Sequence, residues 1–193
     1  MREILLYLHI KNSKAMKKLI FPAVAAILLS AVSCTGKAGH DSTPVAQLDL
    51  QRFLGTWYEI AKFDHTFEKG IDNATAEYSL KDDGKILVVN SGWKDGKREV
   101  AEGKAKCPDP VGNPAHLRVA FFLFFYADYN VLYLDPDYQY VLIGSKSDKY
   151  LWLMSRTPQL DEQAKKILLD EAERRGYDTS ALIWVDQSRN IKS

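Results

Sequence analysis

The residues of this sequence that could carry chemistry are two cysteines and four histidines. A catalytic cysteine needs a thiolate that a neighbouring group activates inside a cavity. Cys107 instead ends an expected strand beside Pro108, where nothing indicates such a group. The histidines lack the spacing of a metal site; they are His9, His40, His65 and His116. The sequence therefore predicts no catalytic residue, no cofactor and no metal site, and a protein that is not an enzyme.

Cys34 stands at a position typical of lipid attachment. A charged stretch, Met16–Lys18, precedes an apolar run, Leu19–Leu29, and small residues then lead to the cysteine. The run is shorter than the roughly 20 apolar residues that a membrane-spanning helix needs. This order is that of a cleaved signal peptide, and its end resembles the bacterial lipobox, whose cysteine becomes the acylated first residue. We expect acyl chains such as palmitate on Cys34, with residues 1–15 as an upstream extension.

The part of the chain after Cys34 has the size and charge of one weakly acidic domain. Removal of the first 33 residues would leave 160 of the 193 and would change the formal net charge from +1 to −3. A chain of this length can bury a core as a single domain. Without a basic run it does not favour nucleic acid as a partner. Residues 34–47 are predicted to form a lipidated N-terminus and flexible tether, and residues 48–193 the folded domain.

Short β-like segments separated by turn signals make up most of this domain. One amphipathic helix is predicted at 159–175, where Leu160, Ala164 and Leu168 recur on one face and Gly176 follows as a C-cap. The expected strands are 55–63, 74–80, 85–91, 98–106, 115–122, 129–134, 138–144 and 149–156, with a short last strand at 181–186. Eight antiparallel strands at this spacing indicate a sandwich or an up-and-down barrel.

Three motifs, in this order, resemble those of the lipocalin family. They are Gly55-x-Trp57 in the first strand, Asp137-Tyr138 before the seventh strand and Arg156 at the end of the eighth. The stretches "GTWYEIAKF", "YLWLMSRTP" and "IWVDQ" resemble the bacterial branch, which is similar to apolipoprotein D. The resemblance covers residues 48–187. It implies an all-β fold, an eight-stranded antiparallel up-and-down β-barrel with one C-terminal α-helix packed outside and a short ninth strand.

The resemblance also implies that Gly55, Trp57 and Arg156 form a structural floor at the closed end of the barrel. Gly55 would let the chain cross tightly under the sheet. The Arg156 guanidinium would lie over the Trp57 indole, and its other donors would bind carbonyl groups near residues 50–54.

A ligand would then enter from the opposite end, between the loops at about 64–73, 93–98, 122–128 and 145–148. Alternation from Trp57 along the first strand, and the inward positions that the resemblance implies on the others, predict the lining of a ligand site. The predicted ligand-binding residues are Glu59, Ala61, Phe63, Ala76, Tyr78, Val88, Asn90, Ala105, Val119, Phe121, Val131, Tyr133, Trp152 and Met154. Such a mostly apolar set suits one acyl chain of a fatty acid or lysophospholipid.

The resemblance implies a lipid-binding or transport protein of the cell outer membrane, anchored through Cys34 and facing the periplasm. Two alternatives stay open: a carrier of another apolar ligand such as haem, a sterol or a pigment, and a structural envelope protein whose barrel is filled. The apolar run "FFLFFY" at 121–126 continues an expected strand. If that strand ends near Phe122, residues 123–125 would lie on an open-end loop and could form a homodimer contact.

Overall fold

The computed structural model describes residues 39–121 and 125–191 of the chain. The signal peptide and the acylated cysteine that the sequence predicts lie outside these ranges. Within them, no helix has both the length and the apolar character that crossing a membrane requires.

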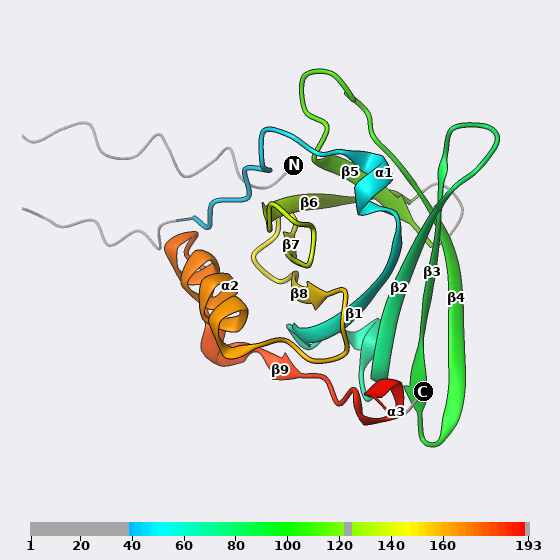
Figure 1. The fold of residues 1–193 in the computed structure, drawn as a ribbon, viewed down its shortest axis with the longest axis vertical. Coiled ribbons are helices and arrows are strands. Elements are labelled where there is room, and N and C mark those ends of the chain that lie inside the picture. The colour runs from blue at the N-terminus through cyan, green and yellow to red at the C-terminus, as the bar shows by residue number, and fades with distance from the viewer. Residues whose placement is uncertain (1–38, 122–124, 192–193) are drawn as a thin grey trace, which may run out of the picture. The chain divides into compact units, whose positions relative to one another are not determined.

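Eight strands of the described chain form a closed ring. Each of β1 to β7 is antiparallel to the next strand in the chain, and β1 pairs with both β2 and β8, which closes the sheet (Figure 1). The elements in chain order, with η for a 3₁₀ helix, are α1 Leu50–Phe53, β1 Gly55–Lys62, η1 Thr66–Glu68, β2 Asp72–Leu80, β3 Ile86–Lys94, β4 Lys97–Lys106, β5 His116–Ala120, β6 Ala127–Leu134, β7 Tyr140–Gly144, β8 Leu151–Ser155, α2 Glu162–Arg174, η2 Thr179–Ala181, β9 Ile183–Trp184 and α3 Ser188–Ile191. The predicted barrel with a short ninth strand is confirmed, since β9 adds to the end of β1.

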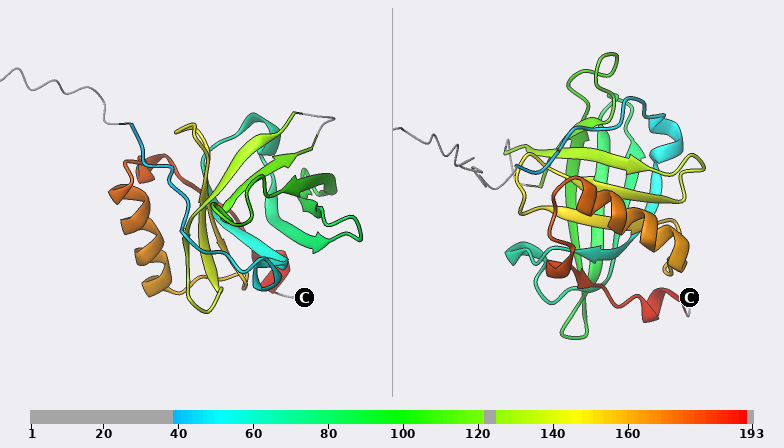
Figure 2. Two further views of the ribbon diagram at one scale, coloured as in Figure 1. Left: turned by 90° about the horizontal axis from the view of Figure 1, so that it is seen from above. Right: turned by 90° about the vertical axis from the view of Figure 1, so that its left-hand side faces the viewer.

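Helix α2 lies on the outside of the barrel, as its amphipathic pattern predicts (Figure 2). The Asp161 side chain caps it by accepting a hydrogen bond from the Ala164 amide, and Gly176 follows its end with φ +88°. The buried face of α2 packs with apolar side chains that point outward from the barrel wall. This helix-facing cluster consists of Ala61, Phe63, Leu132, Leu142, Leu151, Leu153, Leu168, Ala172 and Tyr177.

Register shifts on β1, β2 and β6 change which face of the wall a residue occupies, and those on β1 and β6 affect the predicted site. On β1, the step from Glu59 to Ala61 is matched on β8 by the single step from Met154 to Leu153. On β6, the step from Val131 to Tyr133 is likewise matched by one residue on β7. An extra residue on one strand reverses the inward and outward positions that follow it.

The segment before α1 is attached to the barrel by hydrogen bonds. The Asp41 amide donates to the Arg175 carbonyl oxygen, and the Val45 amide to the Val131 carbonyl oxygen. The Arg175 side chain, only 7% exposed, donates to the carbonyl oxygens of Thr43 and Leu132 and binds Glu171. Between residues 40 and 45, the structure therefore differs from the flexible tether that the polar composition suggests.

Arg175→Ala is expected to lower the free energy of unfolding by about 2–4 kcal/mol, because buried carbonyl groups lose a charged donor. Equilibrium unfolding in urea measures this loss. Arg174→Ala is the matched control, since Arg174 also binds Glu171 but is exposed, and it should change stability little. Equal losses in the two variants would contradict the role of Arg175.

Candidate functional site

One end of the barrel is sealed by a set of contacts around Arg156. Its guanidinium carbon lies 3.8 Å from the centre of the buried Trp57 ring. Its nitrogens donate to main-chain oxygens at 2.7–3.3 Å, namely those of Arg52, Phe53, Thr56 and Tyr138. The Trp57 Nε1 also donates to the Phe53 carbonyl oxygen, at 2.9 Å. Arg156 therefore joins α1, β1 and the β6–β7 turn across this end, and we call this arrangement the floor.

Two residues of the other motifs adopt the backbone conformations that the floor requires. Gly55 has φ +91°, and a Cβ atom there would lie 3.5 Å from Arg156 Nη1. Tyr138 has φ +61°, and its hydroxyl accepts a hydrogen bond from the Asp49 amide at 2.8 Å. The Arg52 guanidinium lies 4.1 Å from the centre of the Tyr138 ring. All three sequence motifs thus meet at the floor, although they are about 20 to 100 residues apart in the chain.

Above the floor, apolar side chains from all eight strands of the ring point into the closed half of the barrel. The buried members of this interior cluster are Phe53, Trp57, Ala76, Tyr78, Ile86, Val88, Ala105, Ala115, Leu117, Val119, Val131, Val141, Ile143 and Met154. A pair of tyrosines supplies a polar group there, with the hydroxyls of Tyr78 and Tyr129 2.8 Å apart.

The other half of the barrel is open to solvent along β4. The residues from Lys97 to Glu102 are all exposed, although alternate side chains of a strand point to opposite faces. Glu99 and Ala101 share the inward face of the buried Ala105, so solvent reaches the interior face of this wall. Phe121 is 43% exposed, and its ring lies against Gly103, where a Cβ atom would come within 2.8 Å of it.

A charged cluster lies on the inner wall at the open end of β1. The Lys62 Nζ is 3.0 Å from Glu59 Oε2 and 3.0 Å from Glu68 Oε2. These residues are 3–9% exposed, and Trp152 Nε1 donates to Glu68 Oε2 at 3.3 Å. We call Glu59, Lys62 and Glu68 the charged cluster; it combines two carboxylates with one ammonium group.

Burial and the second carboxylate change how the charged cluster titrates. Burial, together with the charge of Glu68, raises the pKa of Glu59 to about 7 and outweighs the opposing effect of Lys62. Burial alone would lower the pKa of Lys62, but the two carboxylates hold it above its usual value. Lys62 therefore stays charged at neutral pH, whereas Glu59 gains and loses a proton near pH 7.

Most of the side chains predicted to bind a ligand face the interior. In the interior cluster or packed against it are Ala76, Tyr78, Val88, Ala105, Val119, Val131, Trp152 and Met154. Glu59 joins the charged cluster, and Asn90 lies opposite Ala76 on β3, half buried. Phe121 is on the same wall, next to Gly103.

Three predicted residues lie on the other face of the wall. Ala61, Phe63 and Tyr133 belong to the helix-facing cluster or pack against it. The prediction that they point inward was wrong because each follows a bulge that simple alternation does not include. Ala61 lies opposite Leu153, and Tyr133 opposite Leu142, and both partners face helix α2.

Sequence reasoning missed Lys62 and Glu68. Strict alternation places Lys62 outside, but the bulge turns it inward, opposite Trp152. A clue was present, because a carboxylate predicted inside an apolar barrel needs a buried cation as its partner, and Lys62 follows Glu59 by three residues. Glu68 comes from the β1–β2 loop, and no local pattern indicates its contact with Lys62.

Two further observations concern the reactivity of Cys107 and the capacity to bind a metal ion. Burial raises the pKa of the Cys107 thiol, which disfavours the reactive thiolate. Its Sγ lies 3.6–3.7 Å from the carbonyl oxygens of Asn113 and Pro114. Within residues 39–121 and 125–191, no group of three or more His, Cys, Asp and Glu side chains is placed to hold a metal ion.

Two depressions on the outer surface are lined mainly by polar groups. One, of about 260 Å³, lies over the outer faces of β1 to β4 beside α3. The other, of about 350 Å³, lies between the β6–β7 turn and the start of α2. Neither is lined by a predicted ligand-binding residue, and a polar surface depression does not suit an apolar ligand.

Comparisons with known proteins agree with this geometry. Residues 48–187 match the family model of a lipocalin-like domain. The outer membrane lipoprotein Blc of Citrobacter freundii is 43% identical over 175 residues, which cover 87% of this chain and 97% of that protein. Apolipoprotein D of Bos taurus is 32% identical over 180 residues, covering 88% and 94%. The structure of insecticyanin from Manduca sexta aligns with a TM-score of 0.63 at 25% identity, covering 76% of this chain and 84% of that one.

A closed antiparallel barrel with a sealed floor, an apolar interior and an outer helix defines a small-molecule-binding β-barrel. The chain belongs to the lipocalin family, and within it to the bacterial lipocalins. Members of this family are generally binding or transport proteins.

The floor yields a first test. Trp57→Ala is expected to lower the free energy of unfolding by about 3–5 kcal/mol through loss of a buried aromatic ring. Arg156→Ala should cost about 2–4 kcal/mol through loss of the cation–π contact and the charged hydrogen bonds. Urea unfolding measures both variants, and Arg98→Ala, which removes an exposed arginine of β4, is the control. Wild-type unfolding in both floor variants would contradict a structural role.

Proposed function

We propose that this lipocalin binds or carries fatty acids or lysophospholipids in the cell envelope, held at a membrane by acyl chains on Cys34. The observation that carries the proposal is the barrel itself, which is sealed by the Trp57–Arg156 floor and accessible to solvent along the inner face of β4. The acyl chain would lie among the apolar interior side chains, and its head group near the open end.

The energetics of chain burial support this ligand class. Each buried methylene contributes about 0.8 kcal/mol, so a chain of roughly fourteen gives a gross ~11 kcal/mol. Association costs offset ~4–15 kcal/mol of this. Micromolar affinity is therefore within reach, and one methylene more or less changes it little. The proposed role is binding or transport without catalysis, in agreement with the unactivated thiol of Cys107.

The proposed membrane location rests on two supports. A similar protein, from Citrobacter freundii, is named an outer membrane lipoprotein. The cysteine at the end of the signal-like segment supplies the attachment site, and more than one acyl chain is needed for stable anchoring. We infer an outer-membrane location with the barrel facing the periplasm. Antibody labelling of intact cells tests this orientation. Labelling of the barrel on intact cells would contradict it.

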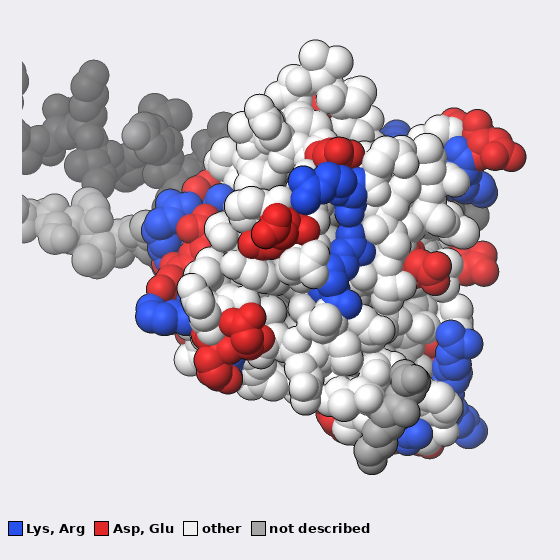
Figure 3. All heavy atoms as spheres, viewed as in Figure 1, with Lys and Arg blue, Asp and Glu red and all other residues white. Residues whose placement is uncertain are grey.

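Nucleic acid is not part of the proposal. The face shown in Figure 3 carries acidic as well as basic side chains. Nucleic-acid-binding domains concentrate basic residues along one face.

Two other functions compete with this one. The barrel could carry a different apolar compound, such as haem, a sterol or a pigment, and the absorbance of the purified protein distinguishes coloured ligands from lipids. Alternatively, the protein could be a structural component of the envelope whose filled barrel binds nothing. The accessible inner face of β4 favours a ligand over a filled barrel.

Titration with palmitoyl lysophosphatidylethanolamine tests the proposed function. Trp152 lies on the interior wall, so its fluorescence should change as the chain enters. Trp152→Phe should remove most of that change, while calorimetry still detects binding. Trp184→Phe is the control, because Trp184 is 47% exposed on β9. No fluorescence change and no heat at saturating lysolipid would favour the filled barrel.

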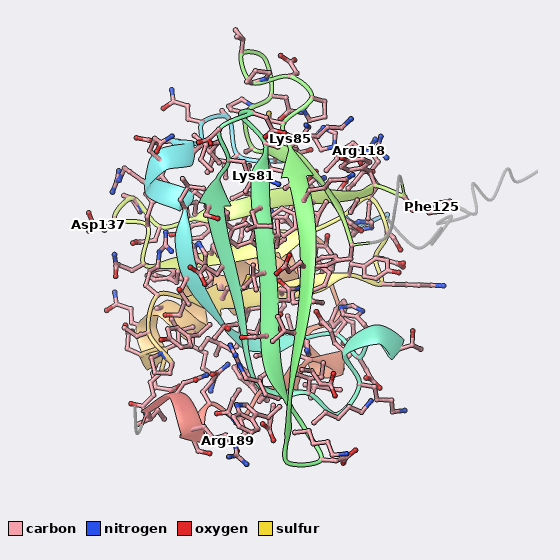
Figure 4. All side chains as sticks on the ribbon, turned by 90° about the vertical axis from the view of Figure 1, so that its right-hand side faces the viewer. Lys81, Lys85, Arg118, Phe125, Asp137 and Arg189 are labelled. Atoms are coloured by element: carbon pink, nitrogen blue, oxygen red, sulfur yellow. The ribbon has the colours of Figure 1, made fainter. Side chains whose placement is uncertain are left out.

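We also infer self-association through the exposed phenylalanines between β5 and β6, Phe121 and Phe125. Phe125 is 74% exposed there (Figure 4), close in sequence to Phe121, whereas Leu123 and Phe124 lie outside the described residues. Phe125→Ser is expected to weaken a homodimer in sedimentation equilibrium by at least several-fold. Val111→Ser, which alters a 93% exposed valine in the β4–β5 loop, should not. A wild-type protein that is monomeric at all concentrations would contradict this inference.

A further inference from the structure

The charged cluster gives the open end of the barrel an unbalanced charge. Glu59 and Glu68 each place one carboxyl oxygen 3.0 Å from Lys62 Nζ, so the ionised cluster has a net charge of −1. The cluster is thus one cation short of neutrality.

This cluster lies where the head group of a bound lipid would be. Glu59 is opposite Met154, and Lys62 is opposite Trp152, and both partners face the interior. Lys62 ends β1 at the open end of the barrel, and Glu68 reaches it from the β1–β2 loop. A chain seated in the closed half would therefore place its polar end beside these three side chains.

Neighbouring groups do not supply the missing positive charge. Burial lowers the pKa of His65, whose ring centre lies 4.8 Å from that of Trp152 with the ring planes tilted by 42°, so this imidazole is mainly neutral at pH 7. Tyr78 on β2 and Tyr129 on β6 have pKa values raised by burial and stay neutral. Asp64, next to His65, adds negative charge. Arg156, a cation that acts on Tyr78, binds at the floor.

We propose that the charged cluster is a head-group site at which a carboxylate-headed lipid binds together with a proton on Glu59, whereas a zwitterionic head group binds without one. When the carboxylate enters, Glu59 takes up one proton from water and forms a hydroxyl, and the proton returns to solvent when the ligand leaves. The protonated cluster is neutral, so Lys62 and the Glu59 hydroxyl can face the anionic head. This inference rests on the proposed function. It distinguishes fatty acids from lysophospholipids by the charge of the head group.

The pH dependence of binding tests the inference. The affinity for palmitate, measured on the full chain carrying Cys34→Ser, should be about tenfold weaker at pH 8 than at pH 6. The reason is that the fraction of Glu59 holding a proton falls from roughly 0.9 to 0.1 around its pKa of about 7. Palmitoyl lysophosphatidylethanolamine should change by less than about twofold over the same range, because it requires no proton.

Matched variants separate Glu59 from the titration of the ligand itself. In Glu59→Gln, the ratio of the affinities for palmitate at pH 6 and pH 8 should be about tenfold smaller than in the wild type. Glu77→Gln, which alters an exposed carboxylate on the outer face of β2, should keep the wild-type difference. The same pH dependence in wild type and Glu59→Gln would overturn the inference.

A measurement on unmutated Glu59 covers the case in which Glu59→Gln does not fold. Calorimetry of palmitate binding at pH 8, in buffers of different ionisation enthalpy, should show uptake of close to one proton per ligand and none for the lysolipid. No proton uptake with palmitate would also overturn the inference. Failure of both lipids to bind at either pH would instead overturn the proposed function.

Discussion

The rest of the structure depends on one contact, the Arg156 guanidinium over the Trp57 indole at 3.8 Å. A ring of strands by itself has two open ends. Arg156 closes one of them because its planar group covers the aromatic face while its nitrogens hold carbonyl groups from α1, β1 and the β6–β7 turn. With that end sealed, the interior has a base on which apolar side chains pack, and any ligand must enter from the opposite end.

The wall above the floor is a closed antiparallel ring, but the alternation of its side chains is interrupted. Single extra residues on β1 and β6 move the positions that follow them from one face to the other. The bulge on β1 has two results. It turns Ala61 and Phe63 toward helix α2, which gives the helix an apolar surface to cover, and it turns Lys62 into the barrel. The same irregularity thus attaches the outer helix and creates the charged cluster.

Ionised side chains inside an apolar barrel have a free-energy cost that packing alone does not offset. Placing Lys62 Nζ 3.0 Å from a carboxyl oxygen of Glu59 and of Glu68 reduces that cost, but two carboxylates share one ammonium group. Burial then raises the pKa of Glu59 into the neutral range. A wholly apolar wall would avoid the free-energy cost of burying ionised side chains if the interior were only a structural core. Charge retained at the open end is better suited to a site that meets the polar end of a ligand.

The sequence by itself determined the order of strands, the outer helix, and the motifs that meet at the floor, because each has a local pattern or a fixed pairing of residue types. It also identified most of the side chains that face the interior. Only the tertiary structure decided the faces of Ala61, Phe63 and Tyr133 and the meeting of Lys62 with Glu68. The physical reason is that a bulge is a mismatch between two paired strands. Its position depends on the register between the two paired strands, and the sequence of neither strand alone indicates that register.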